Sequence, residues 1–164
     1  MEKRFILEGD IDAVTVENFK TFLRTVGHRE TIYMRIKSYG GNVFSGIKIG
    51  NFIRVMKKYK QCTFIMEGEK FHSAALKIFL RGDKRIIQRN PSSDAAIHLP
   101  VVHKNKKKSP EEKEKEEQTT IVLIQQLPHL SESEIRSLNN IPLTVAFMLE
   151  KGIATECIEY FPVL

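Results

Sequence analysis

Strand-like and helix-like segments alternate through the first hundred residues, and this order constrains the fold more than any other feature of the sequence. Short apolar or alternating runs predict five strands, at residues 4–7, 31–36, 61–66, 85–87 and 95–99. Apolar residues three or four positions apart predict three helices, at residues 16–26, 45–59 and 73–81, with Thr15 as a cap and Gly27 as a stop for the first. Such an order favours α/β architecture, with a largely parallel sheet covered by helices.

The chain changes in character after residue 100. Residues 104–118 are nearly all charged, whereas residues 119–127 are apolar and β-branched in their middle. Pro110, followed at once by acidic residues, suits a helix N-terminus, so we expect one long helix here. A capping-box pattern predicts a short helix over 131–138, and a last helix over 144–151 precedes a terminal strand and tail.

Composition limits the class of protein. The 164 residues are 41% hydrophobic and contain no internal repeat, which predicts one domain over 1–164. No window approaches the roughly 18 apolar residues of a membrane span. The N-terminus has no apolar signal segment, so we expect a cytoplasmic protein. Cys62 and Cys157 are far apart and lack metal-ligand spacing, so we expect reduced thiols, no zinc site and no cofactor.

The net charge of +6 and the isoelectric point of about 9.3 raise the question of nucleic-acid binding. The densest basic run, His103–Lys108, is followed at once by the acidic run of residues 111–117. Opposite charges in succession are typical of a solvated loop and helix start. Nucleic acid is therefore not expected as the main partner.

Three pieces of the chain carry candidate chemistry. Gly40 and Gly41 directly follow a predicted strand, where backbone N–H groups can face an oxyanion, although an ordinary turn has the same pattern. Ser73 begins a predicted helix, so it is either a nucleophile, with the Ala74 N–H as oxyanion donor, or a helix cap. His98 ends a predicted strand, where histidines are usually structural. His72 is expected to point away from Ser73.

Together these pieces resemble the proteolytic subunit of Clp protease. The stretch from Ile36 to Gly46 is similar to the family pattern I-x-S-x-G-G-x-v-x-x-G. The segment from Ser73 to Arg85 resembles the one that opens with the family's nucleophile, and Ala96-Ile-His98 resembles its m-i-H strand. The resemblance covers nearly the whole chain in the correct order. It implies a single-domain Clp-protease/crotonase-like fold of repeated β-β-α units, with a protruding handle over about residues 101–130.

The resemblance also implies roles for individual residues. Ser73 would be the nucleophile and His98 the general base, with an oxyanion hole formed from Gly40, Gly41 and Ala74. The implied reaction is acyl transfer, in which an acyl-enzyme forms on the serine and water hydrolyses it.

Several departures from the family pattern bear on activity. Twelve residues before Gly152, where the family has its triad aspartate, this chain has Asn140. In serine proteases such a change can cost about 10⁴ in turnover through the wrong histidine tautomer. Asp94 and Glu156 are possible substitutes. Gly68 lies five residues before Ser73 instead of the family's four, a count that would put His72 in the nucleophile's place; the downstream pattern favours Ser73.

The most consistent interpretation is a small serine peptidase that cleaves peptides or unfolded chains. The apolar patch Ile121–Ile124 would be buried between subunits of a homo-oligomer, with a ring as one possibility. A chain that starts at Met1 leaves no room for the family's N-terminal axial loops, so an AAA+ unfoldase partner is in doubt. The alternatives are a weak or inactive homologue that acts in assembly or binding, and a crotonase-like acyl-thioester enzyme, for which no coenzyme A site is evident.

Overall fold

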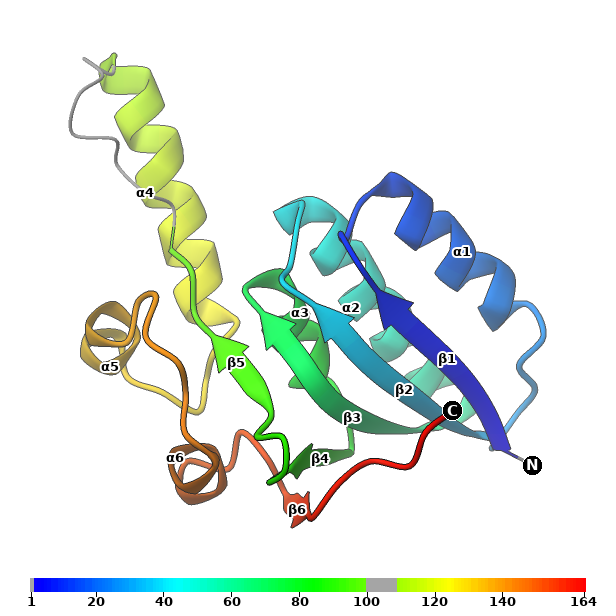
Figure 1. Cartoon of the computed structure of the whole chain (residues 1–164). Coiled ribbons are helices and arrows are strands. Elements are labelled where there is room, and N and C mark those ends of the chain that lie inside the picture. Colours follow the sequence, from blue (N-terminus) through cyan, green and yellow to red (C-terminus); the bar gives the residue numbers. More distant parts are fainter. Residues whose placement is uncertain (1, 100–108) are drawn as a thin grey trace.

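The computed structural model describes residues 2–99 and 109–164 (Figure 1). Its strands are β1 (Glu2–Glu8), β2 (Thr31–Ser38), β3 (Thr63–His72), β4 (Lys84–Gln88), β5 (Asp94–Ala96) and β6 (Glu156–Ile158). Its helices are α1 (Ala13–Leu23), α2 (Val43–Lys60), α3 (Ala74–Phe79), α4 (Pro110–Gln125), α5 (Glu132–Ser137) and α6 (Val145–Glu150). The basic run 103–108 and the first part of the predicted handle lie outside the described residues.

The strands form one parallel sheet in the order β1-β2-β3-β4-β6, with β5 added beside the end of β3. Helices α1, α2 and α3 lie together on one face of this sheet (Figure 1). Each follows a strand and leads to the next parallel strand, as a crossover connection requires. The predicted α/β architecture with a parallel sheet is confirmed.

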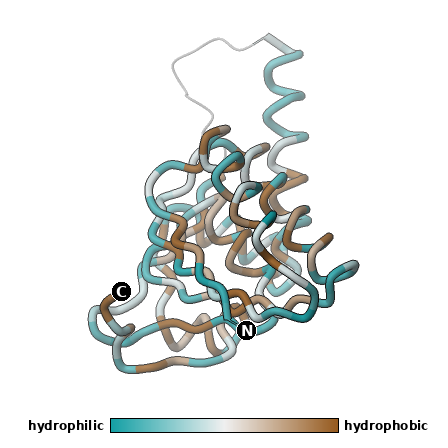
Figure 2. Tube along the Cα trace, turned by 90° about the vertical axis from the view of Figure 1, so that its right-hand side faces the viewer, coloured by the Kyte–Doolittle hydropathy of each residue, from teal (hydrophilic) through white to brown (hydrophobic). Residues whose placement is uncertain are grey.

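The core lies between the sheet and these helices. Hydrophobic residues concentrate along the strands and on the inner sides of the helices, as Figure 2 shows. Phe71 of β3 and Phe79 of α3 stack with ring centroids 4.2 Å apart, and both are fully buried. Gly68 lets these rings pack against β3, because a Cβ there would lie 2.4 Å from the Phe71 ring. Burial of aromatic rings supplies much of the driving force for such a core.

The C-terminal tail covers part of the sheet's other face. The Phe161 N–H donates to Gln88 Oε1 at 2.7 Å, and Arg35 of β2 donates to the Pro162 carbonyl at 2.6 Å. The Arg35 guanidinium also lies over the Phe161 ring, 5.0 Å from its centroid. The tail therefore ties the end of the chain to strands far away in the sequence.

Helix α4 projects away from the body of the molecule (Figure 1). Ser109 caps it by accepting from the Glu112 N–H, and Pro110 occupies the first turn, as expected. The outer part of the helix is hydrophilic in Figure 2. Within the predicted apolar patch, Leu123 is only 3% exposed, whereas Ile121 and Val122 remain 38% and 39% exposed. Leu123 is therefore already buried within its own chain, and only part of the patch is free.

Several predicted boundaries differ from the structure, most clearly those of α1 and β3. Helix α1 starts earlier than predicted, because Asp12 and not Thr15 is the cap; Thr15 completes a capping box with it. The helix also ends before Gly27. Strand β3 runs six residues beyond Met66, through Gly68 to His72, since the glycine is accommodated by the neighbouring rings. This extension carries β3 directly to Ser73.

Candidate active site

The carboxyl ends of β2, β3 and β5 meet at one edge of the sheet, and the candidate residues lie there. Ser73 directly follows β3, and the Gly40-Gly41 turn directly follows β2. His98 lies two residues beyond the end of β5, the strand that runs beside the end of β3. In open parallel sheets this edge is the usual position of a ligand site.

Ser73 has a backbone conformation that is unusual for a residue with a side chain. Its φ is 54° and its ψ is −120°, and its N–H donates to the Ala96 carbonyl at 2.9 Å. Its side chain makes no capping hydrogen bond to α3, so it does not serve as a helix cap. Strained backbone of this kind costs about 1–3 kcal/mol and is common at active sites.

Gly40 packs directly against this serine. A Cβ on Gly40 would lie 2.9 Å from the Ser73 Cβ and 3.0 Å from the His72 carbonyl oxygen, and its φ is +101°. Both the space and the conformation therefore require glycine at this position. The β2–α2 turn and the β3–α3 turn thus form one packed unit.

Two backbone N–H groups at this edge have no acceptor within the described residues. The Ala74 N–H is at the first position of α3, where helical donors have no intrahelical partner, and the Gly41 N–H lies in the adjacent turn. The Gly40 N–H donates to Ser38 Oγ at 3.0 Å instead. Of the three predicted oxyanion donors, Gly41 and Ala74 are therefore the two whose N–H groups are free.

His98 and Asn140 are in direct contact. The Nδ1 atom of His98 is hydrogen-bonded to Oδ1 of Asn140. Asn140 has a left-handed backbone with φ of 63°, and its N–H donates to the Ile97 carbonyl at 2.8 Å. The Asn139 side chain accepts from the Leu99 N–H at 2.8 Å. The loop after α5 is thus fixed against the strand that carries His98.

The His72 side chain points toward His98 and forms no hydrogen bond with the neighbouring Ser73 side chain within the described residues. Its Nδ1 lies 3.3 Å from Nε2 of His98, and its Nε2 lies 2.7 Å from Oδ1 of Asp94. The edge of the Tyr39 ring packs against it at 4.9 Å between centroids. Within residues 2–99 and 109–164, the Ser73 hydroxyl forms no hydrogen bond, to His98 or to any other group.

The two proposed substitutes for the triad aspartate differ in position. Asp94 lies at the site, although it bonds to His72 and not to His98. Glu156 instead pairs with Lys84 at 2.8 Å, between β4 and β6, and this contact raises the pKa of Lys84. Only Asp94 can therefore act on the histidines.

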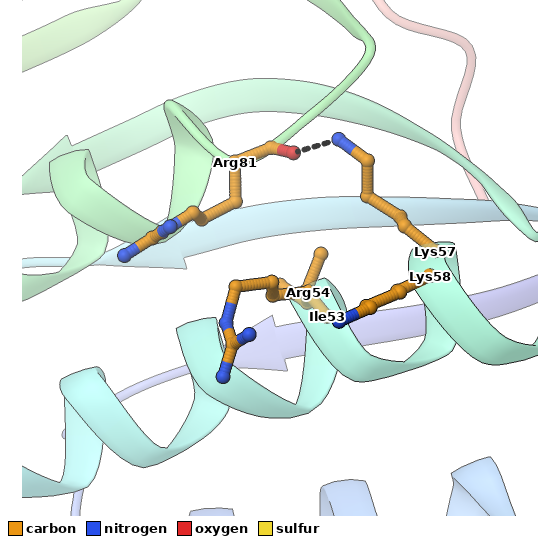
Figure 3. A pocket seen from close by; sticks show the side chains of 5 residues that line it. All are labelled: Ile53, Arg54, Lys57, Lys58 and Arg81. Carbon is orange, nitrogen blue, oxygen red and sulfur yellow. Dashed lines mark hydrogen bonds between the residues drawn. The ribbon is translucent and has the colours of Figure 1, made fainter.

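Two hollows on the surface of the described residues differ in their relation to this site. A basic hollow of about 350 Å³ lies beside the C-terminal half of α2, away from Ser73 (Figure 3). Lys57 donates there to the Arg81 carbonyl at 3.1 Å and pairs with Asp83 at 2.8 Å. Lysines in the last turn of a helix are favoured by its dipole. A wider hollow of about 850 Å³, between Ser92 and α6, borders Asp94 and so reaches the candidate site.

The described residues contain neither a candidate metal-binding group nor a helix that could span a membrane. Across residues 2–99 and 109–164, histidine, cysteine and acidic side chains form no group of three that could hold a metal ion. In the same part of the chain, every helix is too short or too polar to cross a membrane.

The chain is similar to known proteins both in sequence and in fold. The model of the Clp protease family matches residues 2–135. An Asn-to-Asp mutant of ClpP1 from Listeria monocytogenes superposes with a TM-score of 0.78 at 21% identity, over 96% of this chain and 92% of that one. ClpP1 from Listeria monocytogenes superposes with a TM-score of 0.67 at 22% identity, with the same coverage. Among curated proteins, none matches the chain.

Proposed function

The chain belongs to the Clp protease family, and on that premise we propose that it is a serine-type endopeptidase that cleaves peptides or unfolded chains. Ser73 is the nucleophile, His98 is the general base and Asn140 orients the base. The N–H groups of Gly41 and Ala74, beside the Gly40 backbone, form the oxyanion hole. The reaction needs no cofactor, because all of its groups are side chains and backbone amides.

The contact between His98 and Asn140 carries the proposal. Because the amide oxygen of Asn140 only accepts, His98 Nδ1 must carry the proton in this contact. The lone pair is then on Nε2, the nitrogen that a general base uses toward serine. The usual fault of an asparagine in this position, the wrong tautomer, is avoided as long as the amide keeps this orientation.

The reaction proceeds by two acyl transfers. The Ser73 oxygen attacks a peptide carbonyl carbon while its proton passes to Nε2 of His98, and the free N–H groups bind the oxyanion. His98 then gives the proton to the leaving amine as the C–N bond breaks. Water attacks the ester with His98 as base, and the acid leaves Ser73 free.

We further propose that the protein works as a homo-oligomer that associates through α4. The exposed apolar residues Ile121 and Val122 lie on an otherwise charged helix that projects from the body. A second copy of the same helix is the partner that fits this pattern best. Apolar side chains in such a position favour contact with another protein surface.

Hydrolysis of fluorogenic peptides tests the peptidase. We expect the purified protein to release the fluorophore, and Ser73→Ala to reduce kcat by at least about 10³, the contribution of an activated serine. Ser92→Ala, an exposed serine near the wider hollow, is the matched control and should leave kcat unchanged. Equal rates for wild type and Ser73→Ala would contradict the proposal.

A second candidate function is a weakly active or inactive homologue that acts in assembly or binding. It is favoured by one observation: among the described residues the Ser73 hydroxyl has no hydrogen-bond partner, and Nε2 of His98 faces His72 instead. Peptidase sites without substrate often have loose contacts of this kind. Complete absence of turnover in wild type and in Asn140→Asp, with an intact oligomer, would favour this second function.

A further inference from the structure

We propose that His72 and Asp94 act together as a positioning pair that stabilises the protonated form of His98 during acyl transfer. The pair would supply the negative charge that the neutral Asn140 lacks. This inference rests on the peptidase function proposed above. It concerns two residues to which the family resemblance gives no role.

The register of the strands brings the three side chains together. His72 of β3 pairs with Ala96 of β5, so Asp94 and His98 flank its partner at two residues on either side. Side chains two residues apart lie on the same face of a strand. His72 therefore lies between a carboxylate and the catalytic histidine, and its side chain is only 13% exposed.

The protons in this group can be counted. The carboxylate of Asp94 only accepts, so Nε2 of His72 carries a proton; the oxygen of Asn140 only accepts, so Nδ1 of His98 carries one. These two protons are all that two neutral imidazoles have. The remaining contact, 3.3 Å between Nδ1 of His72 and Nε2 of His98, needs a third proton. All the hydrogen bonds that link Asp94, His72, His98 and Asn140 can therefore form at once when one of the two imidazoles is an imidazolium.

This third proton matches a stage of the reaction. When Nε2 of His98 takes the proton of Ser73, His98 becomes an imidazolium and His72 Nδ1 can accept the new N–H. The chain of bonds then ends on the carboxylate, so one positive and one negative charge are paired through the largely buried His72. When the proton passes to the leaving amine, His98 Nε2 is again an acceptor for Ser73 or water.

Other charged groups near His72 are few. The Tyr39 ring lies against it, and Lys70, two residues earlier on β3, has its Nζ 5.2 Å from the centroid of the same ring. The Asp94 carboxylate is the charged group in hydrogen-bond contact with His72. Asp94 is therefore the group that favours positive charge on the two imidazoles.

The kinetic test makes two substitutions, each in two backgrounds: the wild type and Asn140→Asp. His72→Phe and Asp94→Asn should each lower kcat by about 10- to 100-fold with little change in KM, the range for a hydrogen bond to a charged group. The same two changes, made in an Asn140→Asp background, should lower kcat by less than about threefold, since a carboxylate then contacts His98 directly. His28→Phe, an exposed histidine elsewhere, is the control.

The outcomes separate the pair from a structural role. A merely structural role would lower kcat equally in both backgrounds, and this result would overturn the proposal. So would an increase in kcat for His72→Phe, which would mean that His72 restrains the base. If wild type and Asn140→Asp both fail to cleave any peptide, the peptidase function fails separately.

A measurement that needs no activity tests the pair in that case as well. In Ser73→Ala, labelled with ¹⁵N on histidine, we expect at acid pH a coupling between Nδ1 of His72 and Nε2 of His98 through a shared proton. His72→Phe should abolish it, and Asp94→Asn should weaken it. Absence of this coupling throughout the pH range in which the protein is folded would overturn the inference.

Discussion

At the scale of single residues, the proposed peptidase activity depends on which charge faces His98. Asn140 orients the imidazole but carries no charge, so it cannot compensate the positive charge that forms on His98. We expect Asn140→Asp to raise kcat by about 10-fold or more, because a carboxylate both fixes the tautomer and stabilises the imidazolium. Peptide hydrolysis by both proteins measures this. A lower or unchanged kcat would show that Asn140 is not the third member of the site.

Gly40 is the residue whose replacement most directly tests the packing of the site. In Gly40→Ala, the new Cβ would lie 2.9 Å from the Ser73 Cβ, on backbone at φ +101°. We expect a loss of about 1–3 kcal/mol in the free energy of unfolding, together with a lower kcat. Urea denaturation and peptide hydrolysis measure the two effects. Gly27→Ala, where a Cβ would meet the Glu30 side chain at an ordinary van der Waals distance of 3.9 Å, should change neither.

Much of the site could be predicted from the sequence, because its motifs follow successive predicted strands, and the carboxyl ends of parallel strands lie at one edge of a sheet. The Gly40-Gly41 turn, Ser73, His98 and Asn140 do converge at one edge of the sheet. The contact between His72 and His98 was not predicted, because the direction of the His72 side chain depends on the register between β3 and β5, which local sequence does not contain. The alternation Asp94, Ala96, His98 was the available signal, since it places an acid and a histidine on one face.

At the scale of elements, α3 carries a buried charge that affects stability. Burial lowers the pKa of Lys77 to about 8, and its Nζ has no hydrogen-bond partner within the described residues. Between pH 8 and the ordinary value of 10.5, the unfolded chain binds more protons than the folded one. The free energy of unfolding therefore rises with pH across this window, and the full cost is present below it.

Lys77→Met tests this cost. We expect the free energy of unfolding of the variant to be higher by about 1–3 kcal/mol at neutral pH, because each unit of pKa shift corresponds to about 1.4 kcal/mol. It should also lack the rise in stability between pH 8 and 10.5. Urea unfolding at several pH values measures both, with the exposed Lys48→Met as control. If the free energy of unfolding of Lys77→Met rose by the same amount between pH 8 and 10.5, the pH dependence would come from another group.

Element types were easier to predict than element ends. The alternation of strands and helices, Pro110 in the first turn of α4 and the capping box at Ser131 depend on local patterns, and the structure has them. The end of β3 depends instead on two rings that pack over Gly68, Phe71 of β3 itself and Phe79 of α3. Such tertiary contacts override the tendency of glycine to end a strand.

At the scale of the whole molecule, the account predicts assembly through α4. Because Leu123 is already buried within its own chain, a charge there would disturb the fold, and the test belongs at the exposed neighbours. We expect Ile121→Lys with Val122→Lys to reduce the mass in light scattering toward the 18.9 kDa of one chain. Gln118→Lys adds charge at an exposed polar position and should leave the mass unchanged. An unchanged mass in the double variant would contradict assembly through this surface.

The central claim is that Ser73 is a nucleophile activated by His98. Reaction with a fluorophosphonate probe, followed by mass spectrometry to locate the adduct, tests it most directly, because the probe needs an activated serine but no particular peptide. The account predicts one adduct, on Ser73, that is absent in Ser73→Ala and strongly reduced in His98→Ala. An adduct on another serine, or none in an intact protein and in Asn140→Asp, would contradict it.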